Sequence, residues 1–505
     1  MQTLTNLDTS FLHLETKQTP LHVGGVLIFS APSNEAMTFT RFRRHVIARL
    51  QTARVFRQRL YIPPALLDNP VWVEDADFHI DYHLTRRTIR EPLSHKALEN
   101  LGDTFFSKPL HRDRPLWEMM YVDTDKPTGG FAMLLKVHHS ALDGVSAEAV
   151  ITGLLDFTVK PRVLPTDTWQ PEVLPKLTHV IRRRLGEIKH TPTHTNVLLK
   201  STAALAGLLV KRTLTLRYRH LPSFFSAPKT TFNRPVTAER RYLGVQLSLS
   251  LVKAIKSSQQ GMTVNDVVLA ICAGATRRYL KECGDLPKES LVAMARVEKN
   301  LIVFFDIASR RTQDEKASAG NKVSAMLIKL ATDVEHPVER LHRIHENAQL
   351  AKEYNRDIPI DSLMDLLPVA APALTLSSFS ALKMSRRLPP IFNMVITNVP
   401  GSPVPLYLDG APLQSMSGMV GVYDGVALTF VVMSYRDQLS IGITTTLEAV
   451  LKPELLAQYL QEAAVELAAA VLPAGWNAES TACEVIPLKP YAMPRADVVQ
   501  MTSSA

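Results

Sequence analysis

Two adjacent histidines, followed by an aspartate and a glycine, are the residues of this chain best suited to chemistry. His138 and His139 end an apolar run that begins at Phe131, and Asp143 and Gly144 follow after three further residues. The pattern predicts a buried strand, a tight loop with an imidazole at its mouth, and a helix leading away. A neutral imidazole is a good general base near pH 7, so this segment could deprotonate a hydroxyl or an amine.

Strand geometry separates the two histidines. Side chains of adjacent strand residues point to opposite faces, so one of His138 and His139 is expected to be structural and the other chemical. Strand alternation alone does not show which histidine is structural and which is chemical. Asp143 could cap the following helix or pair with a basic residue and so fix the loop, and Gly144 permits a backbone geometry that a side chain would forbid.

The motif suits acyl transfer from a thioester. A thiol leaving group has a pKa of about 8–9, so an activated hydroxyl can attack directly, with no serine or cysteine nucleophile. The alternative is a core histidine or a chance doublet. Metal binding is not predicted, because the two side chains diverge and no H-E-x-x-H pattern is present.

Length and composition predict a soluble, multidomain protein. The 505 residues favour two or three domains, and three widely spaced cysteines (Cys272, Cys283 and Cys483) form neither a disulfide framework nor a metal pattern. We expect a reducing compartment. The N-terminus lacks the basic start and apolar core of a signal peptide, and no stretch resembles a spanning helix of about 20 apolar residues.

The positive charge is local. Residues 176–219 contain ten basic residues and a single acid. Their net charge of +9 equals the net charge of the whole chain. Two compatible interpretations are a crossing helix with a solvated basic face, and an apolar face that lies on an anionic membrane or lipid droplet. Nucleic-acid binding is not predicted, because the segment lacks interleaved aromatic residues and any nucleic-acid fold signature.

The order of predicted elements indicates two α/β domains: strands mixed with helices form a first domain over residues 1–160. Prolines and the basic stretch mark a linker over 161–231, a second α/β domain covers 232–472, and 473–505 is a loose tail. The predicted helices are 10–15, 40–50, 94–106, 250–259, 267–279 and 453–471. The predicted strands are 20–29, 55–60, 71–73, 78–84, 115–122, 131–137, 243–249, 426–435 and 439–445.

Residues 138–144 match the HHxxxDG motif of the superfamily that includes chloramphenicol acetyltransferase, plant acyltransferases and nonribosomal-peptide condensation domains. Five further stretches resemble the bacterial wax ester synthase/diacylglycerol acyltransferase family, in order from about residue 7 to residue 471. They are PLHVGG at 20–25, PLWE at 115–118, TVNDVVLA at 263–270, GNKVS at 320–324 and TNVPG at 397–401.

The resemblance implies two chloramphenicol acetyltransferase-like domains joined by a helical crossover linker, with an active-site tunnel between them. It implies transfer of a fatty acyl group from acyl-CoA, a substrate, to a long-chain alcohol or diacylglycerol, without a cofactor. Such a protein would be cytoplasmic, and peripherally associated with the inner membrane or lipid droplets through 176–219. Two alternative functions are a condensation-type enzyme that uses a carrier-protein thioester, and a catalytically silent protein that binds a lipid droplet or membrane surface.

Residue by residue, His139 matches the general base of the family, beside His138, and Asp143 and Gly144 match its structural aspartate and glycine. The tunnel would be lined by Pro115, Leu116 and Trp117.

Asn265 matches an Asn-Asp motif and could steady an oxyanion or cap a helix, and Asp266 is expected to be structural. One segment departs from the family: 294–319 lacks the usual short strand with a Pro-Val-Ser-x-Arg pattern.

Overall fold

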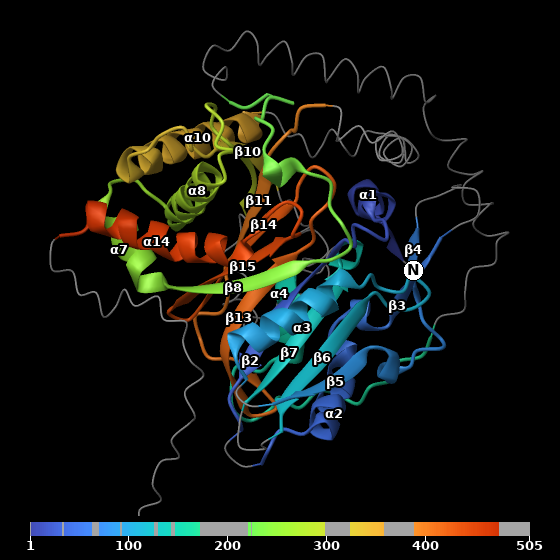
Figure 1. Cartoon of the computed structure of the whole chain (residues 1–505). Coiled ribbons are helices and arrows are strands. Elements are labelled where there is room, and N and C mark those ends of the chain that lie inside the picture. Colours follow the sequence, from blue (N-terminus) through green and yellow to red (C-terminus); the bar gives the residue numbers. More distant parts are fainter. Residues whose placement is uncertain are drawn as a thin grey trace, which may run out of the picture.

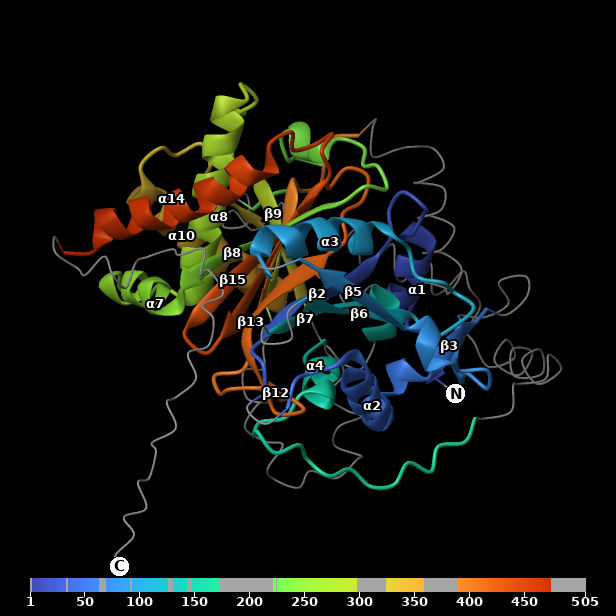
Figure 2. The ribbon, with the colours of Figure 1, turned by 60° about the horizontal axis from the view of Figure 1, so that its bottom comes forward.

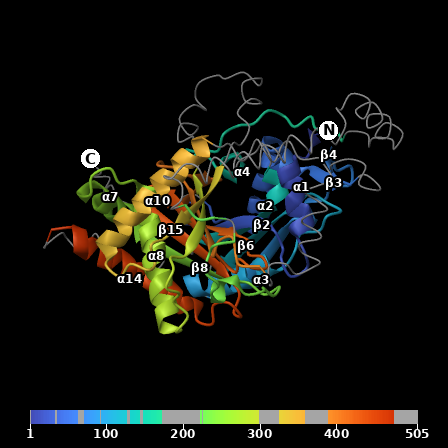
Figure 3. The same ribbon diagram turned by 90° about the horizontal axis from the view of Figure 1, so that it is seen from above.

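Two six-stranded sheets lie side by side, each with its own helices, in the computed structural model of the chain (Figures 1 and 3). The structure describes residues 2–32, 35–62, 70–90, 93–125, 130–142, 147–171, 221–223, 225–297, 324–357 and 388–473.

The N-terminal sheet is built around strand β7, which carries the histidines. In spatial order its strands are β12 (Tyr407–Leu408), β13 (Ala411–Val420), β2 (His22–Phe29), β7 (Phe131–His138), β6 (Trp117–Thr124) and β5 (Leu84–Ile89). Helix α3 (His95–Ser107) covers one face, and α2 (Phe39–Arg49) and α4 (Ala147–Leu154) lie on the other (Figure 2). A small sheet of β1 (Gln2–Thr3), β4 (Val71–Glu74) and β3 (Gln58–Tyr61) lies beside it.

Both faces of this sheet are apolar, which explains why β7 is an almost unbroken apolar run. Alternate residues of β7 enter different cores: Leu134 packs on the α3 side, whereas Phe131 and Leu135 pack on the α2 side. Buried on both faces, the strand has little freedom to slip in register. The end of β7 is therefore a well-defined place from which to present a side chain.

Four of the described helices belong to the C-terminal sheet. Its order is β10 (Ser324–Lys329), β9 (Val292–Val297), β11 (Met394–Val399), β14 (Leu428–Tyr435), β15 (Gln438–Thr445) and β8 (Arg241–Ser248). The helices are α7 (Leu249–Ser258), α8 (Val264–Glu282), α10 (Pro337–Asp357) and α14 (Pro453–Val471). Residues 267–273 of α8 are all buried, as expected for a helix that is apolar on every side.

Strand β13 crosses from the second half of the chain into the N-terminal sheet. It pairs antiparallel with β2, where Gly418 lies opposite Gly25. It also packs against β15: a Cβ atom on Gly442 would lie 1.8 Å from the carbonyl oxygen of Gly418. The backbones of the two sheets are therefore in direct contact, and only glycine permits this approach.

A second joint connects α3 to the edge strand β8. The backbone N–H groups of Arg240, Tyr242 and Gly244 donate to side chains of Ser107 (2.8 Å), Asp103 (2.7 Å) and Glu99 (3.3 Å). Four helical residues rise about 6 Å, which nearly equals two strand residues at about 6.6 Å. Residues four apart on helix α3 therefore lie opposite alternate residues of strand β8. The α3 side chains of the N-terminal domain accept the backbone N–H groups that would otherwise be unpaired at the edge of the C-terminal sheet.

Most predicted elements are confirmed, with ends shifted by a few residues. The prediction of a strand at 78–84 is wrong: Ile80–Tyr82 form a 3-10 helix, and strand β5 begins only at Leu84. The predicted strand at 55–60 is likewise a 3-10 helix at Arg54–Phe56, followed by β3. The segment that departs from the family begins within a regular strand, since β9 pairs with both β10 and β11.

The predicted domain boundaries stay predictions, and residues 407–420, within the predicted C-terminal domain 232–472, join the N-terminal sheet. The basic stretch 176–219, residues 298–319 and the tail beyond 473 lie outside the described residues. Among the helices that the structure describes, none is long and apolar enough to cross a membrane.

Candidate active site

The histidines lie where three strands meet. His138 is the last residue of β7, paired with His22 on β2, and its backbone N–H donates to the carbonyl of Leu116 at 2.9 Å. The N–H of His139 donates to the carbonyl of Leu21 at 3.0 Å. Backbone bonds from both neighbouring strands thus fix the point at which the chain leaves the sheet.

The two imidazoles have different environments, as the alternation of a strand predicts. His138 is 1% exposed, whereas His139 is partly exposed in the 3-10 turn His139–Leu142. The ring of His139 stacks on Phe11 of α1 (Asn6–Leu14), with the ring centroids 3.9 Å apart. His139 is therefore the more exposed of the two histidines, and His138 is buried.

His138 is surrounded by polar groups from two directions. Its Nδ1 lies 2.7 Å from Oγ of Ser140 and 3.2 Å from the backbone nitrogen of that residue. Its Nε2 lies 3.4 Å from Oε1 of Glu15.

Glu15 ends helix α1, and its side chain is only 7% exposed. The carboxylate accepts the N–H of Leu21 at 3.1 Å and a guanidinium N–H of Arg112 at 2.8 Å. Burial alone would raise the pKa of Glu15, but the contacts with His138 and Arg112 outweigh it and lower the pKa to about 2. The group is an anion at neutral pH.

Two further buried polar residues share the His138 face of the sheet. Nε2 of His22 lies 3.0 Å from the carbonyl of Phe106, and burial places the pKa of His22 well below its usual value, with Lys136 acting in the same direction. The Lys136 ammonium is fully buried and bonds the carbonyls of Phe105 and Lys108, beside Glu118 at 3.0 Å. His22 is therefore neutral, and Lys136 ties β7 to α3.

Ser140, His138 and Glu15 have the residue types of a nucleophilic triad, but not its accessibility. Ser140 is 0% exposed, so no substrate carbonyl can reach its hydroxyl. Cys272 is also fully buried, and burial raises its pKa to about 12. Neither side chain is placed to form an acyl-enzyme.

The Asn-Asp pair lies at the start of α8, in the second domain. The cap of this helix is Thr263, which forms a capping box with Asp266, so the interpretation of Asn265 as the cap is wrong. Asp266 also contacts Nδ1 of His345 at 2.8 Å. The buried Nδ2 of Asn265 has no hydrogen-bond partner among the described residues, which leaves an amide donor available.

The side chains of Leu116 and Trp117 pack in the N-terminal core and are 0% exposed, and their place along a tunnel stays a prediction. The indole N–H of Trp117 donates to the carbonyl of Phe56 at 3.0 Å, and its ring stacks on His83. Pro115 is also buried. These residues contribute through the backbone, because the carbonyl of Leu116 positions His138.

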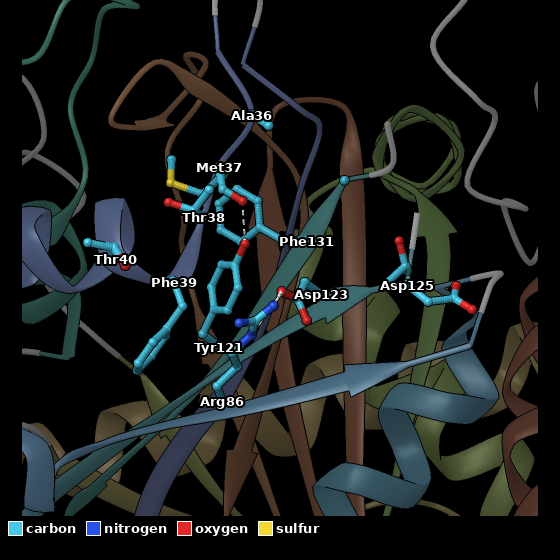
Figure 4. Close-up of a pocket in the computed structure, with 12 residues that line it drawn as sticks. Ala36, Met37, Thr38, Phe39, Thr40, Arg86, Tyr121, Asp123, Asp125 and Phe131 are labelled. Carbon is cyan, nitrogen blue, oxygen red and sulfur yellow. Dashed lines mark hydrogen bonds and ion pairs between the residues drawn. The ribbon is translucent and has the colours of Figure 1, made fainter. Parts of the chain in front are cut away.

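Asp143 and Gly144 lie outside the described residues, so their predicted roles stay predictions. A cavity of about 340 Å³ lies at the opposite end of β6 and β7, lined by residues such as Tyr121, Asp123 and Phe131 (Figure 4). It is distant from the histidines, because Phe131 and His138 are the two ends of one strand. The described residues contain no group of three potential metal ligands.

Residues that sequence reasoning missed are Phe11, Glu15, His22 and Ser140. For Phe11 and Glu15 the sequence contained a partial indication, because two residues four apart lie on the same face of a helix.

Comparison with solved structures identifies the class. The wax ester synthase/diacylglycerol acyltransferase from Marinobacter aquaeolei VT8 superposes with a TM-score of 0.64 at 27% identity, covering 93% of this chain and all of that one. A trichothecene 15-O-acetyltransferase from Fusarium sporotrichioides (TM-score 0.56, 12% identity, 92% and 95% covered) shares the fold. Fold and histidine motif therefore define an acyltransferase with two chloramphenicol acetyltransferase-like domains.

Sequence comparison identifies the family. The wax ester synthase/diacylglycerol acyltransferase catalytic domain matches residues 4–268, and the C-terminal domain of that family matches 319–468. A probable diacylglycerol O-acyltransferase of Mycobacterium tuberculosis is 30% identical over 471 residues (92% of this chain, 98% of the relative). An O-acyltransferase of Acinetobacter baylyi is 30% identical over 469 residues (92% and 96%). The chain belongs to the wax ester synthase/diacylglycerol acyltransferase family.

Proposed function

We propose that this protein transfers a fatty acyl group from acyl-CoA to the hydroxyl of a long-chain alcohol or a diacylglycerol, with His139 as general base. The observation that carries the proposal is the position of His139. It is the partly exposed histidine of the motif, at the end of a buried strand, in a chain whose relatives are named O-acyltransferases.

The reaction needs no covalent enzyme intermediate. His139 takes the proton of the acceptor hydroxyl, and the oxygen attacks the thioester carbonyl. The tetrahedral intermediate then collapses, the carbon–sulfur bond breaks, and the imidazolium returns the proton to the thiolate of coenzyme A. The burial of Ser140 and Cys272 supports this direct route.

Asn265 is our candidate for stabilising the oxyanion. Its buried Nδ2 has no hydrogen-bond partner among the described residues, and a donor in that state is available to a developing negative charge. Since Thr263 caps α8 and Asp266 completes the capping box, the amide of Asn265 is not needed to satisfy the helix end.

The substrates are apolar, so they are drawn from a lipid surface. Residues 176–219, with their excess of nine positive charges, are suited to an anionic membrane or lipid droplet. We therefore propose a cytoplasmic protein, peripherally associated with the inner membrane or lipid droplets.

The test supplies palmitoyl-CoA with hexadecanol or dioleoylglycerol and follows release of free thiol. We expect turnover by wild type, and a loss of at least about a hundredfold in His139→Ala. His79→Ala is the matched control, because His79 is an exposed histidine of the same domain. Equal rates in wild type and His139→Ala would refute the mechanism.

A further inference from the structure

The protonation of His138 follows from its neighbours. The backbone nitrogen of Ser140 lies 3.2 Å from Nδ1, and a backbone N–H can only donate. Nδ1 must therefore be an acceptor without a proton. A neutral His138 carries its proton on Nε2, the atom that faces Glu15.

Glu15 is the partner that the structure offers to this proton. Oε1 of Glu15 lies 3.4 Å from Nε2, and no hydrogen-bond partner of Nε2 is present among the described residues. The distance exceeds that of a normal hydrogen bond, so the contact is an ionic attraction between an anion and a polar N–H. Leu21 and Arg112 fix the carboxylate from its other sides.

The same helix reaches both histidines. Phe11 and Glu15 are four residues apart, which places them on one face of α1 and its C-terminal cap. Phe11 stacks on the ring of His139, while Glu15 faces His138. The helix therefore contacts the partly exposed imidazole and the buried one beneath it.

We propose that Glu15 is a positioning residue for the general base: its carboxylate acts together with the N–H of Ser140 to favour the Nε2–H tautomer of His138. In this tautomer Nδ1 accepts from Ser140, and this bond fixes the turn that presents His139. The proposal rests on the proposed acyl transfer. It assigns a role to an N-terminal helix that lies far from the motif in sequence. Glu15 does not contact the substrate in this mechanism.

The deciding variant is Glu15→Leu, which removes the acceptor in every side-chain rotamer. We expect kcat to fall by about ten- to a hundredfold, because the base is displaced, with KM within about twofold of wild type. In ¹⁵N-histidine-labelled protein we expect the ring signals of His138 to change from the Nε2–H to the Nδ1–H pattern. A His138→Asn variant assigns these signals among the 16 histidines.

Asp156→Leu is the matched control. Asp156 is also a buried carboxylate of the N-terminal domain, paired with Arg49 at 2.8 Å, but it contacts neither histidine. We expect it to lower stability and to leave kcat within about threefold of wild type. If Glu15→Leu does not fold, Glu15→Ala, which likewise carries no acceptor, is judged by the same two readouts.

The proposal is overturned if the Glu15 variant has wild-type kcat, or if kcat falls while the His138 ring signals stay unchanged. The second result would mean that the loss of Glu15 lowers kcat through an effect other than the tautomer of His138. If wild type releases no thiol with either acceptor, the proposed function fails, whereas the tautomer measurement still tests whether Glu15 orients His138.

Discussion

The ionised state of Glu15 makes the stability of the N-terminal domain depend on pH in a calculable way. The pKa of this carboxyl is about 2 in the folded protein, against an ordinary value of 4.5. A lowered pKa in the folded state contributes stability above pH 4.5, and this contribution is lost as the pH falls toward 2. The group is almost fully buried, so solvent screens its interactions little.

The magnitude follows from the two pKa values. The complete shift corresponds to about 3 kcal/mol, and about 1.4 kcal/mol of it is lost at pH 3.5. Glu15→Gln removes the titrating group. We therefore expect the difference in unfolding free energy between wild type and Glu15→Gln to shrink by about 1.3 kcal/mol between pH 5.5 and pH 3.5.

Urea unfolding followed by tryptophan fluorescence measures this difference. Three of the four tryptophans, Trp72, Trp117 and Trp169, lie in the first 170 residues, so the signal reports mainly on the N-terminal domain. Glu289→Gln is the control, because that carboxylate is exposed, pairs with no basic group among the described residues, and should give no pH-dependent difference. A difference between wild type and Glu15→Gln that stays constant from pH 5.5 to pH 3.5 would refute the reasoning.

Two further predictions concern the nucleophile and the domain joint. Ser140→Ala should lower thiol release by no more than about tenfold, because the hydroxyl contact with His138 is lost but the backbone N–H of residue 140 still donates to Nδ1. A true acyl nucleophile would lose about a thousandfold or more, and mass spectrometry of the protein during turnover should detect no acyl adduct. Gly442→Ala should lower the unfolding free energy by about 1–3 kcal/mol, because its Cβ would overlap the Gly418 carbonyl. Gly244→Ala, opposite Gly442 in register, meets only Ser417 Oγ at 3.4 Å, and calorimetry should find it close to wild type.

Local patterns predicted much of the fold. Three local signals were the apolar run before His138, the helical pattern of residues 94–106, and the two strand patterns at 426–435 and 439–445 that are separated by only three residues. The prediction of a strand at 78–84 failed because the true strand, β5, lies at the sheet edge. Its exposed Arg86 and Arg87 give no apolar alternation, while the preceding turn happens to alternate.

The site was predictable only in part. Strand alternation correctly predicted that His138 and His139 lie in different environments, while their predicted roles stay predictions. It could not reveal Glu15, which lies more than a hundred residues before His138 and meets it only because α1 packs on the turn after β7. The cap of α8 could not be assigned from the sequence, because Thr263, Asn265 and Asp266 are all suitable cap residues, and only the backbone geometry distinguishes them.

The crossing of β13 has a consequence for synthesis on the ribosome. Strand β2 emerges early, but its outer neighbour is formed by residues 411–420, near the end of the chain. Throughout most of translation, the edge of β2 carries unpaired backbone groups beside an apolar sequence, Val26 to Phe29. The nascent protein is therefore expected to need protection from aggregation until residues 411–420 are made, and neither half should be obtainable as an independent soluble fragment.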